Sequence, residues 1–409
     1  MGRVGIIGAG PAGLVLASLL SEAGIECAVH ERHTRAEVEA RPRAGLLEQR
    51  TVDLLRGHGL AERLLREGVP HGGCLFLCAG RRVRLDYEKL SGGARHWVYP
   101  QQFLVRDLIA HLAEAPGVTL RFASPVRAVQ DIETRPALRG TDGIERFDVV
   151  AGCDGSRGVA RRALPPGRTR ETVRHYPYGW LAVLAEVDRP VEEIVYAGHP
   201  RGFAGLMPRS ARISRFYLQC GPHDTPGMWP PHRVRGELRS RLEHAAELLP
   251  RLHRVTECQV LRMRSSVTEP LCHGRLFLAG DAAHVLTPCG AKGMNLAIAD
   301  AAALADCLTR WLREDDPGAA GAYSASRLHE VRRVQEFSGR LLHLLHLPPD
   351  AGEGHGVELR LRQAALDRLA EGGPYAEDFA RQYVTCEPRP LPGSLGTLPL
   401  PGPAATGTA

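Results

Sequence analysis

The chain has 409 residues, 44% of them hydrophobic, and a formal net charge of +6. This length can form two or three folded units around a substantial core, and the charge is spread along the chain without the Lys/Arg block typical of nucleic-acid or membrane-surface binding. No apolar run approaches the roughly 20 residues that a spanning helix needs. We therefore expect neither nucleic acid nor membrane as a partner, and the basic balance suits anionic small molecules.

The ten cysteines are scattered without a C-x-x-C pair, and the N-terminal segment is a glycine-punctuated strand and helix instead of a signal peptide. This usage is typical of reduced thiols. We expect a cytoplasmic protein without a metal site.

Residues 4–13 read VGIIGAGPAG, and Gly8, Gly10 and Gly13 match G-x-G-x-x-G between an expected strand and a helix that begins at Pro11. In such turns the glycines allow a tight turn, close approach of backbone to a pyrophosphate and close helix packing, while the helix N-terminus attracts the phosphates. Glu31 ends the next apolar strand, where an acid can accept hydrogen bonds from a ribose. The stretch predicts a bound dinucleotide.

Further along, the apolar residues between Leu46 and Leu55 recur with a helical period, and residues 74–87 alternate as in a β-hairpin. A second βα unit ends in the motif CDG. From residue 176 to about 264 the runs alternate and carry aromatic residues, which predicts an antiparallel sheet inserted into the dinucleotide domain. The inner face of that sheet is a suitable place for a substrate.

Three separated motifs, namely GAGPAG with Glu31, CDG at residues 153–155 and GDAAH at residues 280–284, together resemble the single-component flavoprotein aromatic hydroxylases. The segments RAGLLEQRTVDLL, YPYGWLAVLAE, YAGHPRGFA, HGRLFLAGDAAH and GAKGMNLA look like the para-hydroxybenzoate hydroxylase family, over essentially the whole chain up to Val384. The resemblance implies FAD as the bound cofactor, NADH or NADPH and O2 as co-substrates, and a small aromatic acid as the substrate. Members are often dimers, which implies a homodimer.

The implied fold is α/β (α+β): an FAD-binding, Rossmann-like (GxGxxG) domain with an inserted antiparallel-sheet substrate domain and C-terminal helices. We assign residues 1–70, 99–175 and 265–345 to the FAD-binding domain, and residues 71–98 and 176–264 to the substrate domain. Residues 346–386 form a C-terminal helical region. Residues 387–409, rich in Pro, Gly and Thr, form a tail that we expect to be disordered.

The resemblance also implies which residues hold the cofactors. A helix N-terminus at residues 290–295 would face the pyrimidine ring of the flavin, where its positive dipole end stabilises the negative charge of the reduced ring. The positions implied for FAD are Gly8, Gly10, Ala12, Gly13, Glu31, Arg32, Arg41, Arg43, Ala44, Gly45, Leu46, Gln101, Asp154, Asp281, Gly293, Met294 and Asn295. Those implied for NAD(P)H are Arg32, Glu37, Arg41, Arg43, Arg157 and Arg264. The Glu37 carboxylate would repel a 2′-phosphate, which favours NADH or dual use.

For the substrate, the resemblance implies that Arg209 pairs with a benzoate carboxylate and that Tyr196 faces the phenol. Tyr383 would be the next member of a proton relay, His71 its outlet, and Pro288 would border the ring edge under attack. The implied catalytic set is Tyr196, Tyr383, His71 and Pro288, and the implied substrate-binding set is Tyr196, Met207, Arg209, Tyr217, Pro288, Gly205 and Trp180.

The implied reaction is reduction of FAD by NAD(P)H, addition of O2 to give a flavin C4a-hydroperoxide, and transfer of its distal oxygen to an electron-rich ring. Removal of the phenolic proton through the relay makes the ring a better nucleophile. Water has to be excluded, because it promotes decay to H2O2.

The sequence departs from the family pattern in the walls of this pocket. Met207 stands where the family has a serine, Gly205 where a leucine usually packs beside the ring, and Cys289 where a threonine follows the proline. We expect Gly205 to open space for a ring substituent. A 3-substituted acid, such as 3-amino-4-hydroxybenzoate hydroxylated at carbon 2 in secondary metabolism, therefore stands beside 4-hydroxybenzoate as the substrate. A flavin reductase that does not hydroxylate and a flavin redox sensor remain as alternatives.

Overall fold

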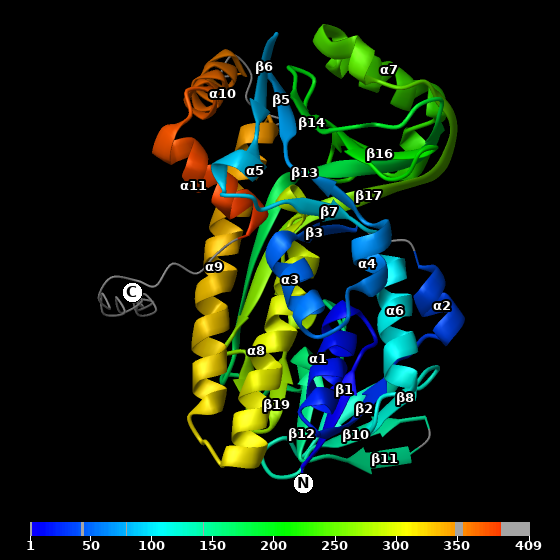
Figure 1. Ribbon diagram of the computed structural model, residues 1–409, viewed down its shortest axis with the longest axis vertical. Helices are drawn as coiled ribbons and strands as arrows, with labels where there is room; N and C mark the ends of the chain where they lie inside the picture. Colours follow the sequence, from blue (N-terminus) through cyan, green and yellow to red (C-terminus); the bar gives the residue numbers. More distant parts are fainter. Residues whose placement is uncertain (1, 42–44, 79, 142, 348–354, 386–409) are drawn as a thin grey trace, which may run out of the picture.

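The structure is a computed structural model that describes residues 2–41, 45–78, 80–141, 143–347 and 355–385. The expected disordered tail, together with Arg43 and Ala44, lies outside the described residues. Figure 1 shows a sheet with its helices at the N-terminal end of the molecule and a second large sheet at the opposite end.

The first strand, β1, lies inside a six-stranded sheet with the order β18-β19-β12-β1-β2-β8. Its neighbours β2 and β12 both run parallel to it, as is typical where helices connect the strands. The strands are β1 (Arg3–Ile7), β2 (Glu26–His30), β8 (Val118–Arg121), β12 (Val149–Gly152), β18 (Cys272–His273) and β19 (Leu276–Leu278). The predicted Rossmann-like arrangement is confirmed.

Helix α1 (Pro11–Glu22) follows β1 after the glycine turn and is buried along most of its length. It packs against α8 (Lys292–Glu314) and α6 (Gln101–Ala113). The other helices at this end are α2 (Arg35–Ala40), α3 (Gln49–Gly57), α4 (Glu62–Glu67) and the short η1 (Arg161–Ala163). A three-stranded antiparallel sheet of β9 (Val126–Gln130), β10 (Ala137–Gly140) and β11 (Gly143–Arg146) lies beside them.

The second large sheet has eight strands in the order β20-β17-β13-β16-β15-β14-β5-β6. Its strands are β5 (Cys74–Cys78), β6 (Arg81–Leu85), β13 (Arg170–Val187), β14 (Ile194–Gly198), β15 (Ala204–Pro208), β16 (Ile213–Cys220), β17 (Leu252–Glu269) and β20 (His284–Val285). The predicted inserted sheet is present, but it is mixed, because β14 and β5 pair in parallel. The long strands β13 and β17 continue across the expected domain boundaries at residues 175 and 264, so the sheet itself connects the two ends of the molecule.

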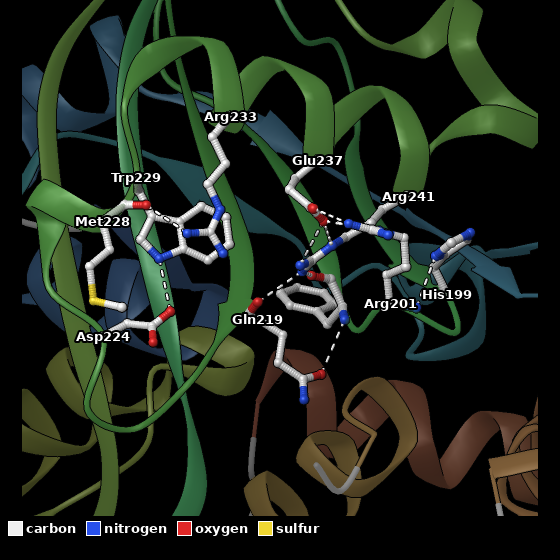
Figure 2. Close-up of polar contacts among 10 residues, drawn as sticks. His199, Arg201, Gln219, Asp224, Met228, Trp229, Arg233, Glu237 and Arg241 are labelled. Carbon is white, nitrogen blue, oxygen red and sulfur yellow. Dashed lines mark hydrogen bonds and ion pairs between the residues drawn. The ribbon is translucent and has the colours of Figure 1, made fainter. Parts of the chain in front are cut away.

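One face of this sheet is covered by α7 (Pro231–Arg241), flanked by η2 (Pro226–Met228) and η3 (Glu243–Leu248). Figure 2 shows how the end of α7 is fixed: Glu237 lies between Arg201 and Arg241. The guanidinium of Arg241 donates to the carbonyl oxygens of Phe203 at 2.8 Å and Gln219 at 2.9 Å. An open groove of about 460 Å³ lies along these residues. The other face of the sheet, which carries Trp180, Tyr196 and Tyr217, packs against residues of the C-terminal helices.

A small antiparallel sheet with the order β3-β7-β4 lies between the two ends of the molecule. Its strands are β3 (Leu46–Glu48), β4 (Val69–His71) and β7 (His96–Val98). The predicted helix over Leu46 to Leu55 is wrong at its start: Leu46 and Leu47 are in β3, and the helix begins at Gln49. The helical period could not show this, because the strand is stabilised by pairing with β7, far along the chain.

The C-terminal helices close the structure. Helix α9 (Ala319–Leu345) runs along α8 and reaches the second sheet, where α10 (His355–Ala370) and α11 (Gly373–Val384) pack (Figure 1). Helix α11 contacts α5 (Tyr87–Leu90), and α10 contacts β5 and β6. These helices confirm the predicted C-terminal helices. Within the described part of the chain, no helix combines the length and apolarity needed to cross a bilayer.

Candidate active site

The glycine turn after β1 is closed on two sides and open on one. Gly8 has a φ of +106°, and a Cβ there would lie 2.5 Å from the carbonyl oxygen of Cys153. A Cβ on Gly13 would lie 2.0 Å from the carbonyl oxygen of Gly8, whereas Gly10 faces open space. Helix α1 then begins without a side-chain cap, so its first N–H groups are available to phosphate oxygens.

Glu31 lies at the mouth of this turn. Its carboxylate accepts hydrogen bonds from the backbone N–H groups of Ala9 and His33, each at 2.9 Å. These bonds fix the acid beside the glycine loop, where a ribose would follow a bound pyrophosphate. Ala12, in contrast, is buried within α1 and helps the helix to pack closely.

The opposite wall of the candidate cofactor site is formed by η4 (Gly280–Ala282) and the start of α8. Asp281 is exposed there, and Ala291, with a φ of +56°, turns the chain into α8, which begins without a side-chain cap. Gly293 in its first turn faces open space. A 23-residue helix thus presents an uncapped, positive N-terminus to the site.

The amide of Asn295 orients that helix end. Its oxygen accepts from the Glu48 N–H at 2.9 Å, and its nitrogen donates to the carbonyl oxygens of Leu46 and Ala291, each at 3.0 Å. The side chain is therefore engaged by β3 and by α8 itself. Asn295 shapes the site by holding the helix N-terminus against β3.

A buried ion pair that the sequence analysis missed lies directly behind this helix end. The Lys292 ammonium donates to Glu48 Oε1 and to the carbonyl oxygen of Tyr383, both at 2.7 Å. Burial raises the pKa of Glu48, and the neighbouring Lys292 opposes that shift. The pair joins β3, α8 and α11, and its members are too far apart in the sequence for any local pattern to show it.

Several other residues expected at the cofactor site serve the scaffold around it. A Cβ on Gly45 would lie 2.0 Å from the carbonyl oxygen of Tyr99, so β3 approaches that backbone closely. Asp154 accepts the Ala160 N–H at 2.9 Å and orders the turn after β12. Leu46, Gln101 and Met294 are half-buried around the cofactor site.

The candidate substrate face lies on the second sheet, opposite α7. Tyr196, Gly205 and Tyr217 are directly opposite one another on β14, β15 and β16. The two tyrosine side chains therefore point to one face, on either side of Gly205. Trp180, on β13, is buried with its ring centroid 4.5 Å from that of Tyr217. These aromatic groups form one wall.

The expected space beside Gly205 is not open. A Cβ on Gly205 would lie 2.7 Å from the ring of Phe203. Phe203 is fully buried and stacks on Trp180 with a centroid distance of 5.0 Å. The expectation that Gly205 opens room for a ring substituent is therefore wrong in this structure, because the side chain of Phe203, just before β15, lies against Gly205.

The cation expected to bind the carboxylate, Arg209, follows β15 at the edge of this wall. Its guanidinium lies 3.4 Å from Gln102 Oε1, and Gln102 was not among the expected site residues. Burial and the nearby Arg215 lower the pKa of Arg209 to about 10. Arg215 is directly opposite Met207 on the neighbouring strand. Two close guanidinium groups favour an anion between the walls.

The two relay tyrosines, distant in sequence, meet in the core. The hydroxyl oxygens of Tyr196 and Tyr383 are 2.7 Å apart. Both side chains are buried, and burial raises both of their pKa values well above the usual range. Phe76 stacks on Tyr196 with a centroid distance of 5.3 Å. A pair of hydrogen-bonded hydroxyls shielded from solvent can pass a proton without losing it to water.

The other expected members of the site are nearby but differently placed. Pro288 precedes η5 (Cys289–Ala291), and its carbonyl oxygen accepts the Ala291 N–H at 3.1 Å. His71, at the end of β4, is half-buried, and burial lowers its pKa. No hydrogen bond joins it to the tyrosine pair among the described residues.

The residues expected to contact NAD(P)H lie at the surface around the cofactor site. Arg32, Arg41 and Arg157 are exposed, and Arg264 is half-buried. Glu37 accepts from the Thr34 N–H at 2.8 Å as part of a capping box for α2. Its carboxylate therefore has a structural function whichever nicotinamide cofactor is used.

Comparison with known proteins agrees with this geometry. A family model described as FAD binding domain matches residues 1–338. The p-hydroxybenzoate hydroxylase of Acinetobacter baylyi is 36% identical over 387 residues, covering 93% of this chain and 95% of that protein. A 3-amino-4-hydroxybenzoate 2-monooxygenase of Streptomyces platensis is 30% identical over 412 residues, with the same two coverages, 93% and 95%. The structure of p-nitrophenol 4-monooxygenase of Pseudomonas putida shares the fold, with a TM-score of 0.76 at 19% identity over 94% of this chain and 97% of that one.

The uncapped helix ends, the open glycines and the Glu31 carboxylate fit an FAD molecule, and the family match requires one. The protein is thus an FAD-dependent flavoprotein monooxygenase. Within that class, the chain belongs to the p-hydroxybenzoate hydroxylase family, and the predicted cofactor and enzyme class are confirmed. The individual roles of the site residues remain predictions.

Proposed function

We propose that the protein hydroxylates the ring of a 4-hydroxybenzoate-type acid, with NAD(P)H and O2 as co-substrates. The observation that carries this proposal is the 2.7 Å contact between the buried hydroxyls of Tyr196 and Tyr383. A reductase or a redox sensor has no need of a shielded hydroxyl pair beside a half-buried arginine. The flavin, when bound, supplies the reducing equivalents and the activated oxygen.

The chain's own residues position and ionise the acid. Arg209 binds the carboxylate through a charge-assisted pair, which directs the phenol at the other end of the ring toward Tyr196. The phenolic proton moves to the Tyr196 oxygen as Tyr196 passes its own proton to Tyr383. The apolar wall of Trp180, Phe203 and Tyr217 keeps water away from the reacting carbon.

Between the two candidate substrates, the wall favours unsubstituted 4-hydroxybenzoate. The Phe203 ring lies against Gly205, where we expected a ring substituent such as a 3-amino group to fit. The second candidate, 3-amino-4-hydroxybenzoate hydroxylated at carbon 2, is supported by the relative from Streptomyces platensis whose name gives that reaction. It requires the Phe203 ring to move.

For the nicotinamide, we propose NADH or dual use, because the Glu37 carboxylate opposes a 2′-phosphate. Hydrogen bonds from Thr34 lower the pKa of the exposed Glu37 carboxyl group, so the group is ionised at neutral pH.

The test is product analysis with the two acids under NADH and under NADPH. We expect 4-hydroxybenzoate to accelerate NAD(P)H oxidation and O2 uptake and to give a dihydroxybenzoate, with 3-amino-4-hydroxybenzoate poorer. If 4-hydroxybenzoate accelerates NAD(P)H oxidation but yields only H2O2, while 3-amino-4-hydroxybenzoate gives a hydroxylated product, the second candidate is established. No hydroxylated product from either acid would contradict both.

A further inference from the structure

A row of titratable side chains crosses the small sheet β3-β7-β4. His96, on the central strand β7, is directly opposite Glu48 on β3 and directly opposite His71 on β4. Side chains at directly opposite positions of antiparallel strands point to the same face. Glu48, His96 and His71 therefore share one face of this sheet, with His96 in the middle.

The His96 ring packs against the second relay tyrosine. It is fully buried, and its centroid lies 5.0 Å from that of Tyr383 and 5.2 Å from that of Tyr87, both in edge-to-face arrangements. His96 thus contacts Tyr383 on one side and has His71 as its cross-strand neighbour on the other. The expected relay, which passes from Tyr383 to His71, contains no such intermediate.

Several buried polar atoms around this position have no hydrogen-bond partner among the described residues. They are both ring nitrogens of His96, Nε2 of His71 and the hydroxyl of Tyr87. Buried polar atoms are nearly always paired, because an unpaired one has lost its hydrogen bonds to water without replacing them. An imidazole that serves only as structure is paired elsewhere in this chain: His346 Nδ1 lies 2.8 Å from the Leu342 carbonyl oxygen, and its Nε2 meets the Trp180 indole N–H.

The surroundings keep His96 neutral. Burial is the main cause that lowers its pKa well below the usual range, and Lys292 on α8 and His71 on β4 act in the same direction. The nearby Tyr383 backbone on α11 raises the pKa of His96 and so opposes this shift, although it forms no hydrogen bond with the ring. Glu48 on β3 is engaged by Lys292 at 2.7 Å, and the titratable rings of Tyr87 on α5 and Tyr383 on α11 pack against His96. A neutral imidazole can accept a proton at one nitrogen and release one from the other.

We propose that His96 is a proton-relay residue between Tyr383 and His71, acting on the reaction through Tyr383. This inference rests on the proposed function. As the phenol O–H bond of the substrate breaks, Tyr196 receives that proton and gives its own to Tyr383. Tyr383 gives its proton to one nitrogen of His96 through one bridging water, since no direct hydrogen bond joins the two side chains among the described residues. His96 releases the proton from its other nitrogen to half-buried His71 and so to solvent. Each relay residue gains one proton and loses one, so the net result is transfer of the phenolic proton from the substrate to solvent.

The experiment uses the full-length, FAD-loaded enzyme with 4-hydroxybenzoate bound. A rapid pH jump, followed by absorbance of the phenolate, measures how fast the bound phenol loses its proton. The variants are His96→Gln, which keeps a polar side chain of similar size, and His96→Ala, which leaves room for added imidazole. The control is His273→Ala, which removes an imidazole that pairs with Glu133 far from the sheet β3-β7-β4.

We expect both His96 variants to bind the acid but to deprotonate it about 100-fold more slowly. Because the path to solvent is broken, their rates should rise with hydroxide, about tenfold per pH unit, while wild type and His273→Ala stay nearly flat. Imidazole should restore His96→Ala and leave Tyr383→Phe unchanged.

A His96→Gln enzyme with the wild-type rate and pH profile would overturn the relay. So would a loss in both variants that keeps the wild-type pH profile and does not respond to imidazole, since a packing defect produces that result. If wild type binds no hydroxybenzoate, the proposed function itself fails, and the relay fails with it.

Discussion

Arg209 shows what a single side chain is expected to contribute. It is held in a partly buried position with Arg215 nearby, and burial lowers its pKa only to about 10, so it is charged at neutral pH. A partly buried cation of this kind is stabilised by a carboxylate counter-ion. Its main effect should therefore be on binding of the acid and less on the chemical step.

The substitution Arg209→Ala should weaken 4-hydroxybenzoate binding by about 10- to 100-fold, the equivalent of roughly 1.5–3 kcal/mol for a hydrogen bond to a charged group. Binding of the neutral 4-hydroxybenzamide should change much less. Titration of the flavin absorbance or fluorescence with each ligand measures both constants. Arg212→Ala, in an exposed neighbouring position, is the control. Equal losses for acid and amide would show that Arg209 supports the wall and does not bind the carboxylate.

At the scale of elements, the buried carboxylate of Asp300 fixes helix α8 beside the cofactor site. Asp300 accepts the Gly280 N–H at 2.9 Å, contacts His284 at 2.6 Å and accepts from Arg327 at 2.7 Å. One carboxylate thus joins α8 to η4, β20 and α9. Burial alone would raise its pKa, but His284 and Arg327 outweigh burial and lower it to about 2.

The substitution Asp300→Asn should lower the free energy of unfolding by about 3–5 kcal/mol, because it leaves the buried Arg327 guanidinium without the counter-charge of Asp300. Since the folded pKa is lowered, the ionised carboxylate stabilises the protein above the unfolded pKa of 3.8, and the contribution of roughly 2 kcal/mol is lost as pH falls from about 4 to 2. Denaturant unfolding of the FAD-loaded enzyme across pH measures it. Asp306→Asn, exposed on the same helix, should change little. If the difference in free energy of unfolding between wild type and Asp300→Asn stays constant below pH 4, this assignment is contradicted.

Elements set by local pattern could be predicted from the sequence, and those set by distant pairing could not. The strand, glycine turn and helix at residues 3–22 follow from adjacent residues, and Glu31 is next to the turn because one strand and one helix separate them. Leu46 and Leu47 looked helical, yet they pair with β7 about 50 residues away. The relay tyrosines were identified through a family resemblance and meet across 187 residues.

The features missed by the sequence analysis all depend on tertiary register. Glu48 and Lys292 meet across 244 residues, and His96 lies beside His71 only because β4 and β7 pair in that register. No local spacing encodes any of these. The sequence could predict the chemistry of the site but not the shape of its walls.

For the whole molecule, the two large sheets have separate tasks that must meet at one place. In the proposed function, the N-terminal sheet positions the cofactor through helix ends, and the second sheet positions the acid through Arg209 and the tyrosines. The long strands β13 and β17 and helix α9 connect the two ends (Figure 1). Hydroxylation should therefore need the intact relay even when cofactor and acid are both bound.

The most direct test is a single turnover. The enzyme is reduced without oxygen, 4-hydroxybenzoate is added, and hydroxylated product and H2O2 are measured after exposure to O2, in wild type and in Tyr196→Phe. We expect wild type to convert nearly every bound flavin's reducing equivalents into hydroxylated acid. Tyr196→Phe should bind the acid comparably and yield mostly H2O2. Full product yield from Tyr196→Phe, or H2O2 alone from wild type, would contradict a pocket in which the phenol must lose its proton through Tyr196.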